Sequence, residues 1–90
     1  MHTDEYEISI GREISLCRKM IRKLEKSLGK LERQYGMTTA AFLRALEEGR
    51  LSARLPIQRW NLEYRELQLW QKRLTAYEDG LESLKRTWGR

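Results

Sequence analysis

The chain opens with a run of apolar positions that repeats in steps of four and three residues. These positions follow one another without a break: Ile10, Ile14, Cys17, Ile21, Leu24, Leu28, Leu31 and Tyr35. This spacing is the heptad pattern of a helix that packs along one stripe against another helix. A strand would scatter the same residues over both faces of a sheet. The pattern therefore predicts a first helix over about residues 4–35, and Gly36 tolerates the left-handed conformation in which helices commonly end.

A second apolar stripe of similar length lies in the last third of the chain. Pro56 fits the first turn of a helix, where its missing amide proton is not needed. Helical spacing then continues almost to the end of the chain: Ile57, Trp60, Tyr64, Leu67, Trp70, Leu74, Tyr77, Leu81, Leu84 and Trp88. We predict a long helix over about residues 56–88. If the two long helices lie antiparallel, apolar residues pair at every level, for example Leu31 with Trp60 and Ile14 with Tyr77.

Between the long helices, the sequence predicts a short helix over about residues 39–48. Phe42, Ala45 and Leu46 form one apolar face at helical spacing, and either Thr38 or Thr39 is the expected N-cap. Residues 50–55 are expected to form an irregular link. The expected architecture is one all-α domain over residues 1–90, an antiparallel coiled-coil hairpin of two long helices with a short connecting helix.

More apolar surface is present than a two-helix hairpin can bury. Leu62, Leu69 and Ala76 recur every seven residues beside the main stripe of the third helix, while Leu16 and Met20 widen the stripe of the first. Contiguous apolar surface of this kind commonly marks an interface. We therefore expect these five residues to form a homodimer interface, with two hairpins associating into a four-helix bundle. The alternative is a hairpin that offers the same flank to a different protein.

The inventory of reactive residues argues against an enzyme. One cysteine and one histidine provide neither an intramolecular disulfide nor a ligand set for structural zinc. The chain has no Gly-rich phosphate loop and no Ser, His, Asp set. We therefore expect no catalytic residue, no cofactor, no metal and no small-molecule substrate. No apolar run approaches ~18 residues, and the first residues are acidic where a signal peptide would be basic, so we expect a cytoplasmic protein without membrane contact.

The formal net charge of +5 is concentrated in the second half of the first helix. From Arg18 to Arg33, seven cations are accompanied by two carboxylates, and the rest of the chain is balanced. Clustered Lys and Arg side chains bind nucleic acid by releasing counterions from phosphates. The simpler interpretation is the solvated outer face of an amphipathic helix. Both interpretations stay open, and the candidate nucleic-acid residues are Arg18, Lys19, Arg22, Lys23 and Lys26.

The connector between the long helices is where a rigid hairpin has most freedom to choose a partner, since recognition commonly lies in loops held by a scaffold. Its candidate partner-binding residues are Arg44, Arg50 and Arg54. The segment that follows Glu48 contains no carboxylate before Glu63. An acidic protein surface or a phosphate is therefore an expected partner for the two later arginines. The alternative is that these arginines are solvated loop charges.

The aromatic residues of the third helix favour a core over a stacking platform. Trp60, Tyr64, Trp70 and Tyr77 lie at helical spacing, which is typical of buried positions. Trp88 differs because it lies near the end of the chain. It either docks on the first helix or remains available to a partner, and we count it among the candidate partner-binding residues.

The middle of the chain resembles a known group of proteins. The residues that carry the resemblance are, in order, Tyr35-Gly36-Met37-Thr38, Phe42, Glu48-Gly49-Arg50-Leu51, Trp60, Tyr64 and Leu67. This order is similar to that of small all-helical prokaryotic antitoxin-like proteins from two-gene modules, and the likeness covers roughly residues 34–74. The link after Gly49 is basic here, whereas in that group it tends to be acidic. The resemblance implies binding and occlusion of a partner protein.

We therefore expect a non-enzymatic helical module for protein–protein interaction, antitoxin-like or regulatory in its role. The alternative is a small basic dimer that binds nucleic acid through the outer face of the first helix. Salt separates the two, because nucleic-acid binding by clustered cations weakens steeply as salt rises.

Overall fold

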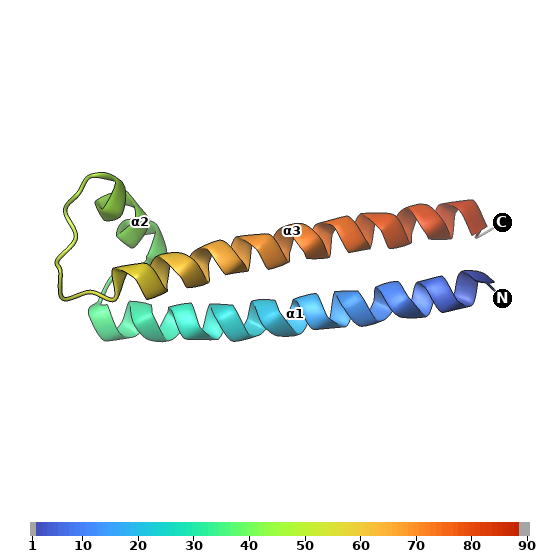
Figure 1. Cartoon of the computed structure of the whole chain (residues 1–90), viewed down its shortest axis with the longest axis horizontal. Helices are drawn as coiled ribbons and strands as arrows, with labels where there is room; N and C mark the ends of the chain where they lie inside the picture. The colour runs from blue at the N-terminus through green and yellow to red at the C-terminus, as the bar shows by residue number, and fades with distance from the viewer. Residues whose placement is uncertain (1, 89–90) are drawn as a thin grey trace.

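The computed structural model describes the backbone of residues 2–88 and the side chains of residues 5–86. It contains three helices, α1 (His2–Tyr35), α2 (Thr39–Glu47) and α3 (Ile57–Trp88), and no strand within the described residues. The long helices α1 and α3 run antiparallel along the 57 Å length of the molecule (Figure 1). The start of α1 and the end of α3 lie together at one end of the molecule, and α2 lies at the other end (Figure 1). The predicted all-α fold and the packing of the two long helices are confirmed.

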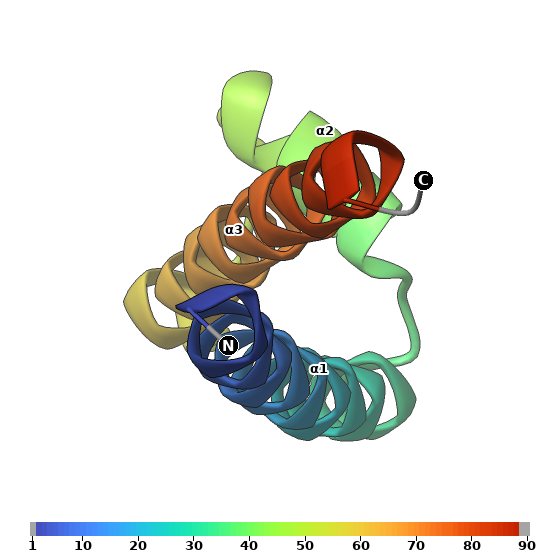
Figure 2. The same cartoon turned by 90° about the vertical axis from the view of Figure 1, so that its right-hand side faces the viewer.

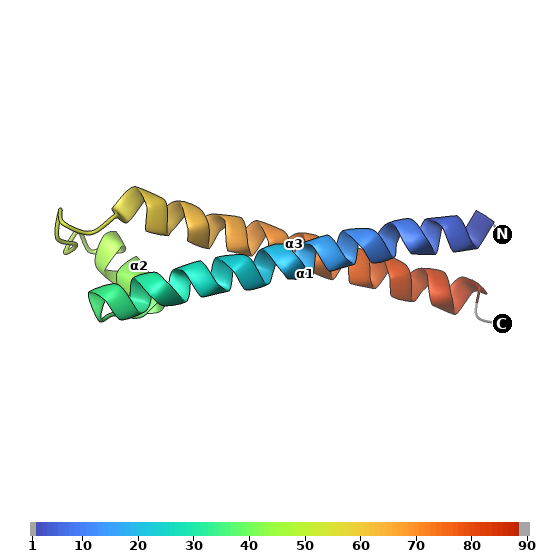
Figure 3. The same cartoon turned by 90° about the horizontal axis from the view of Figure 1, so that it is seen from below.

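The heptad stripe of α1 forms the contact with α3. Six of its eight residues are buried, and Ile21 and Tyr35 are half-buried. The two helices cross at a shallow angle (Figures 2 and 3), as helices do when ridges of side chains fit into grooves. The hydroxyl of Ser27 donates to the carboxylate of Glu63, and Arg18 pairs with Glu78 near the other end, so polar contacts bridge the helices at two levels.

The turn between α1 and α2 follows the predicted chemistry. Gly36 has a positive φ of 63°, the left-handed conformation expected after the last turn of a helix. Of the two candidate caps, Thr38 is the N-cap of α2, because its hydroxyl accepts a hydrogen bond from the backbone N–H of Ala41 at 3.0 Å. Gly49, with a φ of 67°, follows the end of α2 in the same conformation.

The largest buried side chains gather where α2 folds over the start of α3. Phe42 and Trp60 are fully buried, and their rings stack with centroids 4.3 Å apart and planes inclined by 8°. The Trp60 indole N–H donates to the Thr39 hydroxyl at 3.1 Å, which gives this buried donor its partner. The Thr39 N–H in turn donates to the Glu32 carboxylate at 2.6 Å. These contacts hold α2 against both long helices.

The opposite end of the hairpin has no third element among the described residues (Figure 1). There, Ile10, Ile14 and Cys17 of α1 are buried, but Leu74 and Leu81 of α3 stay half-exposed. Two helices alone cover only one side of each other, so the other sides of these leucines remain in contact with solvent.

Candidate functional site

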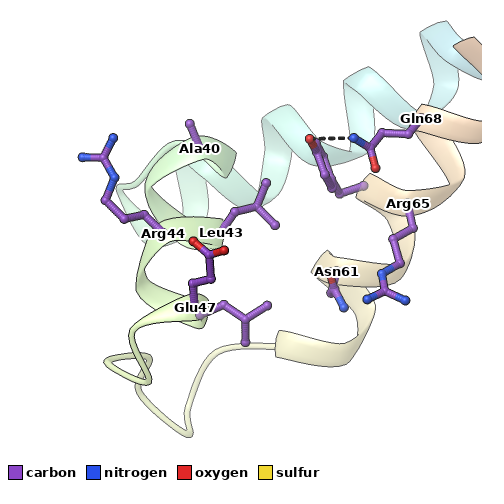
Figure 4. Close-up of a pocket in the computed structure, with 9 residues that line it drawn as sticks. Ala40, Leu43, Arg44, Glu47, Asn61, Arg65 and Gln68 are labelled. Atoms are coloured by element: carbon purple, nitrogen blue, oxygen red, sulfur yellow. Dashed lines mark hydrogen bonds between the residues drawn. The ribbon is translucent and has the colours of Figure 1, made fainter.

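A groove lies between α2 and the first half of α3. It encloses about 510 Å³, and its walls are formed by Ala40, Leu43, Arg44, Leu46 and Glu47 of α2 and by Asn61, Tyr64, Arg65 and Gln68 of α3 (Figure 4). We call it the α2–α3 groove. The docking of Phe42 on Trp60 creates it, because this contact fixes α2 beside α3 and leaves the next residue, Leu43, at the edge of the contact.

The floor of the α2–α3 groove is apolar. Leu43 and Leu46 are half-buried and pack on the core that Phe42 and Trp60 belong to. Tyr64 is also half-buried, and its hydroxyl accepts a hydrogen bond from the Gln68 amide at 2.9 Å. The groove thus combines an apolar base with a polar rim, which is the usual anatomy of a surface that binds a protein segment.

The rim carries charges without partners. Arg44 on α2 and Arg65 on α3 are exposed, and neither forms an ion pair with a described residue. Arg65 lies on the α3 wall, and Arg44 extends along the outer side of α2 (Figure 4). Glu47 lies between them and is likewise unpaired among the described residues. Guanidinium groups in this state are suited to paired hydrogen bonds with carboxylates.

The structure separates the three predicted connector arginines. Arg44 lines the α2–α3 groove, whereas Arg50 and Arg54 lie in the link after α2. Arg50 was expected to find its anionic partner on another molecule, but Glu48 of the same chain neutralises it. Its Nη2 and Nε atoms donate to the two carboxylate oxygens of Glu48 at 2.9 and 3.2 Å. Arg54 is exposed, and its side chain has no ion pair with a described residue.

The five predicted interface residues do not form one continuous strip. Leu62 and Leu69 are 57% and 54% exposed, Leu16 is 44% exposed, Ala76 is exposed and Met20 is half-buried. On α3, the three residues each follow a residue of the apolar stripe by two positions, and two positions turn a helix by about 200°. They therefore lie on the outer face of α3, which points away from α1, rather than beside the stripe.

The remaining aromatic residues of α3 are only partly covered. Tyr64, Trp70 and Tyr77 are half-buried, in contrast to Trp60. The guanidinium carbon of Arg73 lies 4.8 Å from the centre of the Trp70 ring, a cation–π contact that covers one face of the ring. The backbone of α3 extends to Trp88, but the side chain of this predicted partner-binding residue lies outside the described residues.

The candidate nucleic-acid residues of α1 fall into two groups. Lys19, Arg22, Lys23 and Lys26 are exposed, and none forms an ion pair with a described residue. Arg18 differs, because its Nη2 atom lies 3.0 Å from the Glu78 carboxylate of α3. Arg18 therefore belongs to the contact between the long helices, and the other four residues remain available to an anion.

Among the described residues, Cys17 is a free and buried thiol. No group of three or more His, Cys, Asp or Glu side chains suitable for a metal ion gathers within the described residues. Burial, with a smaller contribution from the charge of Glu13, raises the pKa of the Cys17 thiol above its ordinary value of 9.0. A raised pKa keeps the thiol protonated at neutral pH and so unreactive. Among the described helices, none combines the length and the apolarity needed to cross a bilayer.

Two features of the site were missed by sequence reasoning. The first is the α3 wall of the groove, although the spacing of Asn61, Arg65 and Gln68 at steps of four and three already places them on one face. The second is the hydrogen bond from Trp60 to Thr39, for which the sequence carries no signal, because the two residues meet only after α2 docks.

Comparisons of the chain with protein-family models, with curated proteins and with solved structures give no match. The function is therefore inferred from the residues of the site.

Proposed function

We propose that this protein is a non-enzymatic helical interaction module that binds another protein in the α2–α3 groove. The observation that carries the proposal is an apolar floor bordered by two arginines without ion pairs to described residues, Arg65 on the α3 wall and Arg44 on the outer side of α2 (Figure 4). Apolar anchors supply most of the affinity of such interfaces, and charges on the rim select the partner.

The occupant that fits is an amphipathic helix of the partner with acidic residues beside its apolar face. Apolar side chains of such a helix can rest on Leu43 and Leu46, and its carboxylates can reach Arg44 or Arg65. The unpaired Glu47 favours one basic residue among the acidic ones. Lys72, one turn beyond Gln68, adds a further exposed cation where a second depression continues along α3.

The antitoxin-like role belongs to the same proposal. The resemblance over residues 34–74 includes α2, the two turns that flank it and the α3 wall of the groove, so the surface proposed to bind lies inside the resembling stretch. Binding there would occlude a surface of the partner rather than change it chemically. A cytoplasmic location is part of this proposal.

A homodimer that forms a four-helix bundle is also part of the proposal. Leu62 and Leu69 expose more than half of their surfaces on the outer face of α3, and burial of such residues is favourable by roughly 25 cal/mol per Å². Because Leu69 makes no contribution to the buried core of one chain, Leu69→Glu is expected to leave helicity intact and to convert a micromolar dimer into a monomer in sedimentation experiments. A wild type that sediments as a folded monomer would contradict the dimer.

The groove is tested by site-specific cross-linking. A photo-reactive residue in place of Leu43 is expected to capture a partner in the native host, whereas the same residue in place of Lys26, on the outer face of α1, should not capture that protein. With the captured protein purified, Arg44→Glu combined with Arg65→Glu should weaken binding at least tenfold, which is ~1.4 kcal/mol.

The matched control is Arg50→Ala, which removes a guanidinium that Glu48 already neutralises. It should change binding by less than about twofold, since exposed substitutions of this kind cost within ~0.5 kcal/mol. Equal capture from positions 43 and 26, or unchanged binding by the double variant, would refute the groove as the binding site.

A further inference from the structure

The outer face of α1 carries cations at a strict seven-residue interval. Arg12, Lys19, Lys26 and Arg33 are all exposed. Seven residues make almost two turns and advance the helix by about 10.5 Å, so these four side chains lie in a row about 30 Å long. Three further exposed cations flank this row: Arg22, Lys23 and Lys30. We call these seven residues the cationic ridge.

The cationic ridge is not neutralised by the rest of the molecule. None of its residues forms an ion pair or a side-chain hydrogen bond with a described residue. The nearby carboxylate of Glu32 is engaged by the backbone N–H of Thr39. Lys26 follows the buried Leu24 by two positions, which places the ridge on the side of α1 that faces away from α3. A ligand can therefore approach its whole length.

We propose that the cationic ridge binds the phosphodiester backbone of duplex nucleic acid without reading its sequence. Phosphate binding requires cations alone, because its free energy comes from the release of counterions. The ridge is a separate surface from the α2–α3 groove, so this inference does not depend on the function proposed for the groove.

The composition of the ridge favours a duplex over other anionic ligands. From residue 12 to residue 33, the exposed residues are cations apart from Glu13, Ser15, Leu16 and Glu25, so Leu16 is the one exposed apolar residue along the ridge. A protein interface needs an apolar centre, and a helix that lies on a membrane needs an apolar face, which α1 has buried against α3. Single strands are bound by stacking of bases on aromatic rings, and the ridge has none.

The experiment is fluorescence anisotropy with labelled duplex DNA and duplex RNA of arbitrary sequence and a length greater than the ridge. If about four ridge cations contact phosphates, the logarithm of the binding constant should fall against the logarithm of salt with a slope of about −3 to −4 between about 50 and 200 mM. Binding to either duplex supports the proposal, and the duplex that binds more tightly identifies whether the natural ligand is DNA or RNA.

Two pairs of substitutions distinguish binding at the cationic ridge from a general effect of net charge. Lys19→Glu combined with Lys26→Glu should weaken binding at least tenfold and reduce the salt slope by about two. Lys72→Glu combined with Lys85→Glu makes the same change of net charge on exposed residues of α3 and should weaken binding less than about threefold. Circular dichroism of both variants checks that helicity is unchanged, and Lys19→Gln with Lys26→Gln repeats the test without added negative charge.

Three outcomes would overturn the proposal. The first is absence of binding to either duplex at about 50 mM salt. The second is an equal loss in the ridge and α3 variants, which would make the interaction a property of net charge alone. The third is tighter binding to a single strand, or to vesicles that contain phosphatidylserine, than to a duplex of equal charge.

Discussion

The two ends of the hairpin are packed differently, although the apolar stripes of α1 and α3 continue through both. At the end where α2 lies, three helices meet, and Trp60 and Phe42 lose all contact with solvent. At the end where α1 begins and α3 terminates, two helices meet, and Leu74, Leu81 and other residues of the α3 stripe remain half-exposed. The first end is called the capped end below, and the second the open end.

The comparison shows what the short helix α2 contributes. An apolar stripe is enough to bring two helices together. Each residue of the stripe is then covered only on the side that faces the other helix. The nine residues of α2 cover a second side, and they supply the ring and the hydroxyl that Trp60 contacts. The same helix also forms one wall of the α2–α3 groove, so the best-packed part of the molecule is next to its candidate binding site.

The largest expected effect is that of Trp60→Ala at the capped end. Removal of this fully buried ring leaves a cavity beside Phe42 and deprives α2 of its main contact, so the free energy of unfolding should fall by about 3–5 kcal/mol in urea titrations. Trp60→Phe keeps an aromatic ring in place and should cost less. A loss below about 1 kcal/mol for Trp60→Ala would show that α2 does not stabilise the hairpin.

A pair of matched substitutions compares the two ends directly. Leu28→Ala at the capped end should cost about 2–4 kcal/mol, because Leu28 is buried. Leu81→Ala at the open end should cost about 1 kcal/mol, because that side chain is only partly buried. Both values come from urea unfolding at low protein concentration. Equal losses, especially if they grow with protein concentration, would mean that a second copy covers the open end.

The smallest expected effect concerns the buried thiol of Cys17, which lies toward the open end. Burial raises the pKa of Cys17, so the folded protein holds the thiol proton more tightly than the unfolded chain does. The resulting stabilisation is complete below the pKa of the unfolded thiol and is lost as pH rises through the higher pKa of the folded state. Unfolding free energies measured between about pH 8 and pH 10 should therefore fall more in the wild type than in Cys17→Ala. Parallel curves would contradict the shift.

The long helices were predictable because each position of the α1 stripe repeats the same local signal. Ile14, Leu24 and Leu31 are buried as their spacing requires. The roles of Gly36 and Thr38 could be predicted equally well, since a left-handed residue and an N-cap depend on neighbours within a few positions. Whether the chain is one domain, and which surface binds a partner, stay predictions.

Contacts between residues far apart in the chain, such as the hydrogen bond from Trp60 to Thr39, could not be predicted. The local pairing of Arg50 with Glu48 was missed because it depends on the backbone conformation at Gly49, which has a positive φ. The outer position of Leu62 and Leu69, by contrast, was already implied by their spacing, because each follows a residue of the apolar stripe by two positions, and the prediction overlooked it. Periodicity identifies apolar residues, but the tertiary contacts decide which of them remain at the surface.

The hydrogen bonds that cross the hairpin close loops of very different length. The contact of Thr39 with Trp60 closes 21 residues of chain, that of Ser27 with Glu63 closes 36, and that of Arg18 with Glu78 closes 60. Each doubling of a closed loop adds about 0.6 kcal/mol of entropic cost. We therefore expect the refolding chain to close the capped end first and the long helices to pair from there toward the open end.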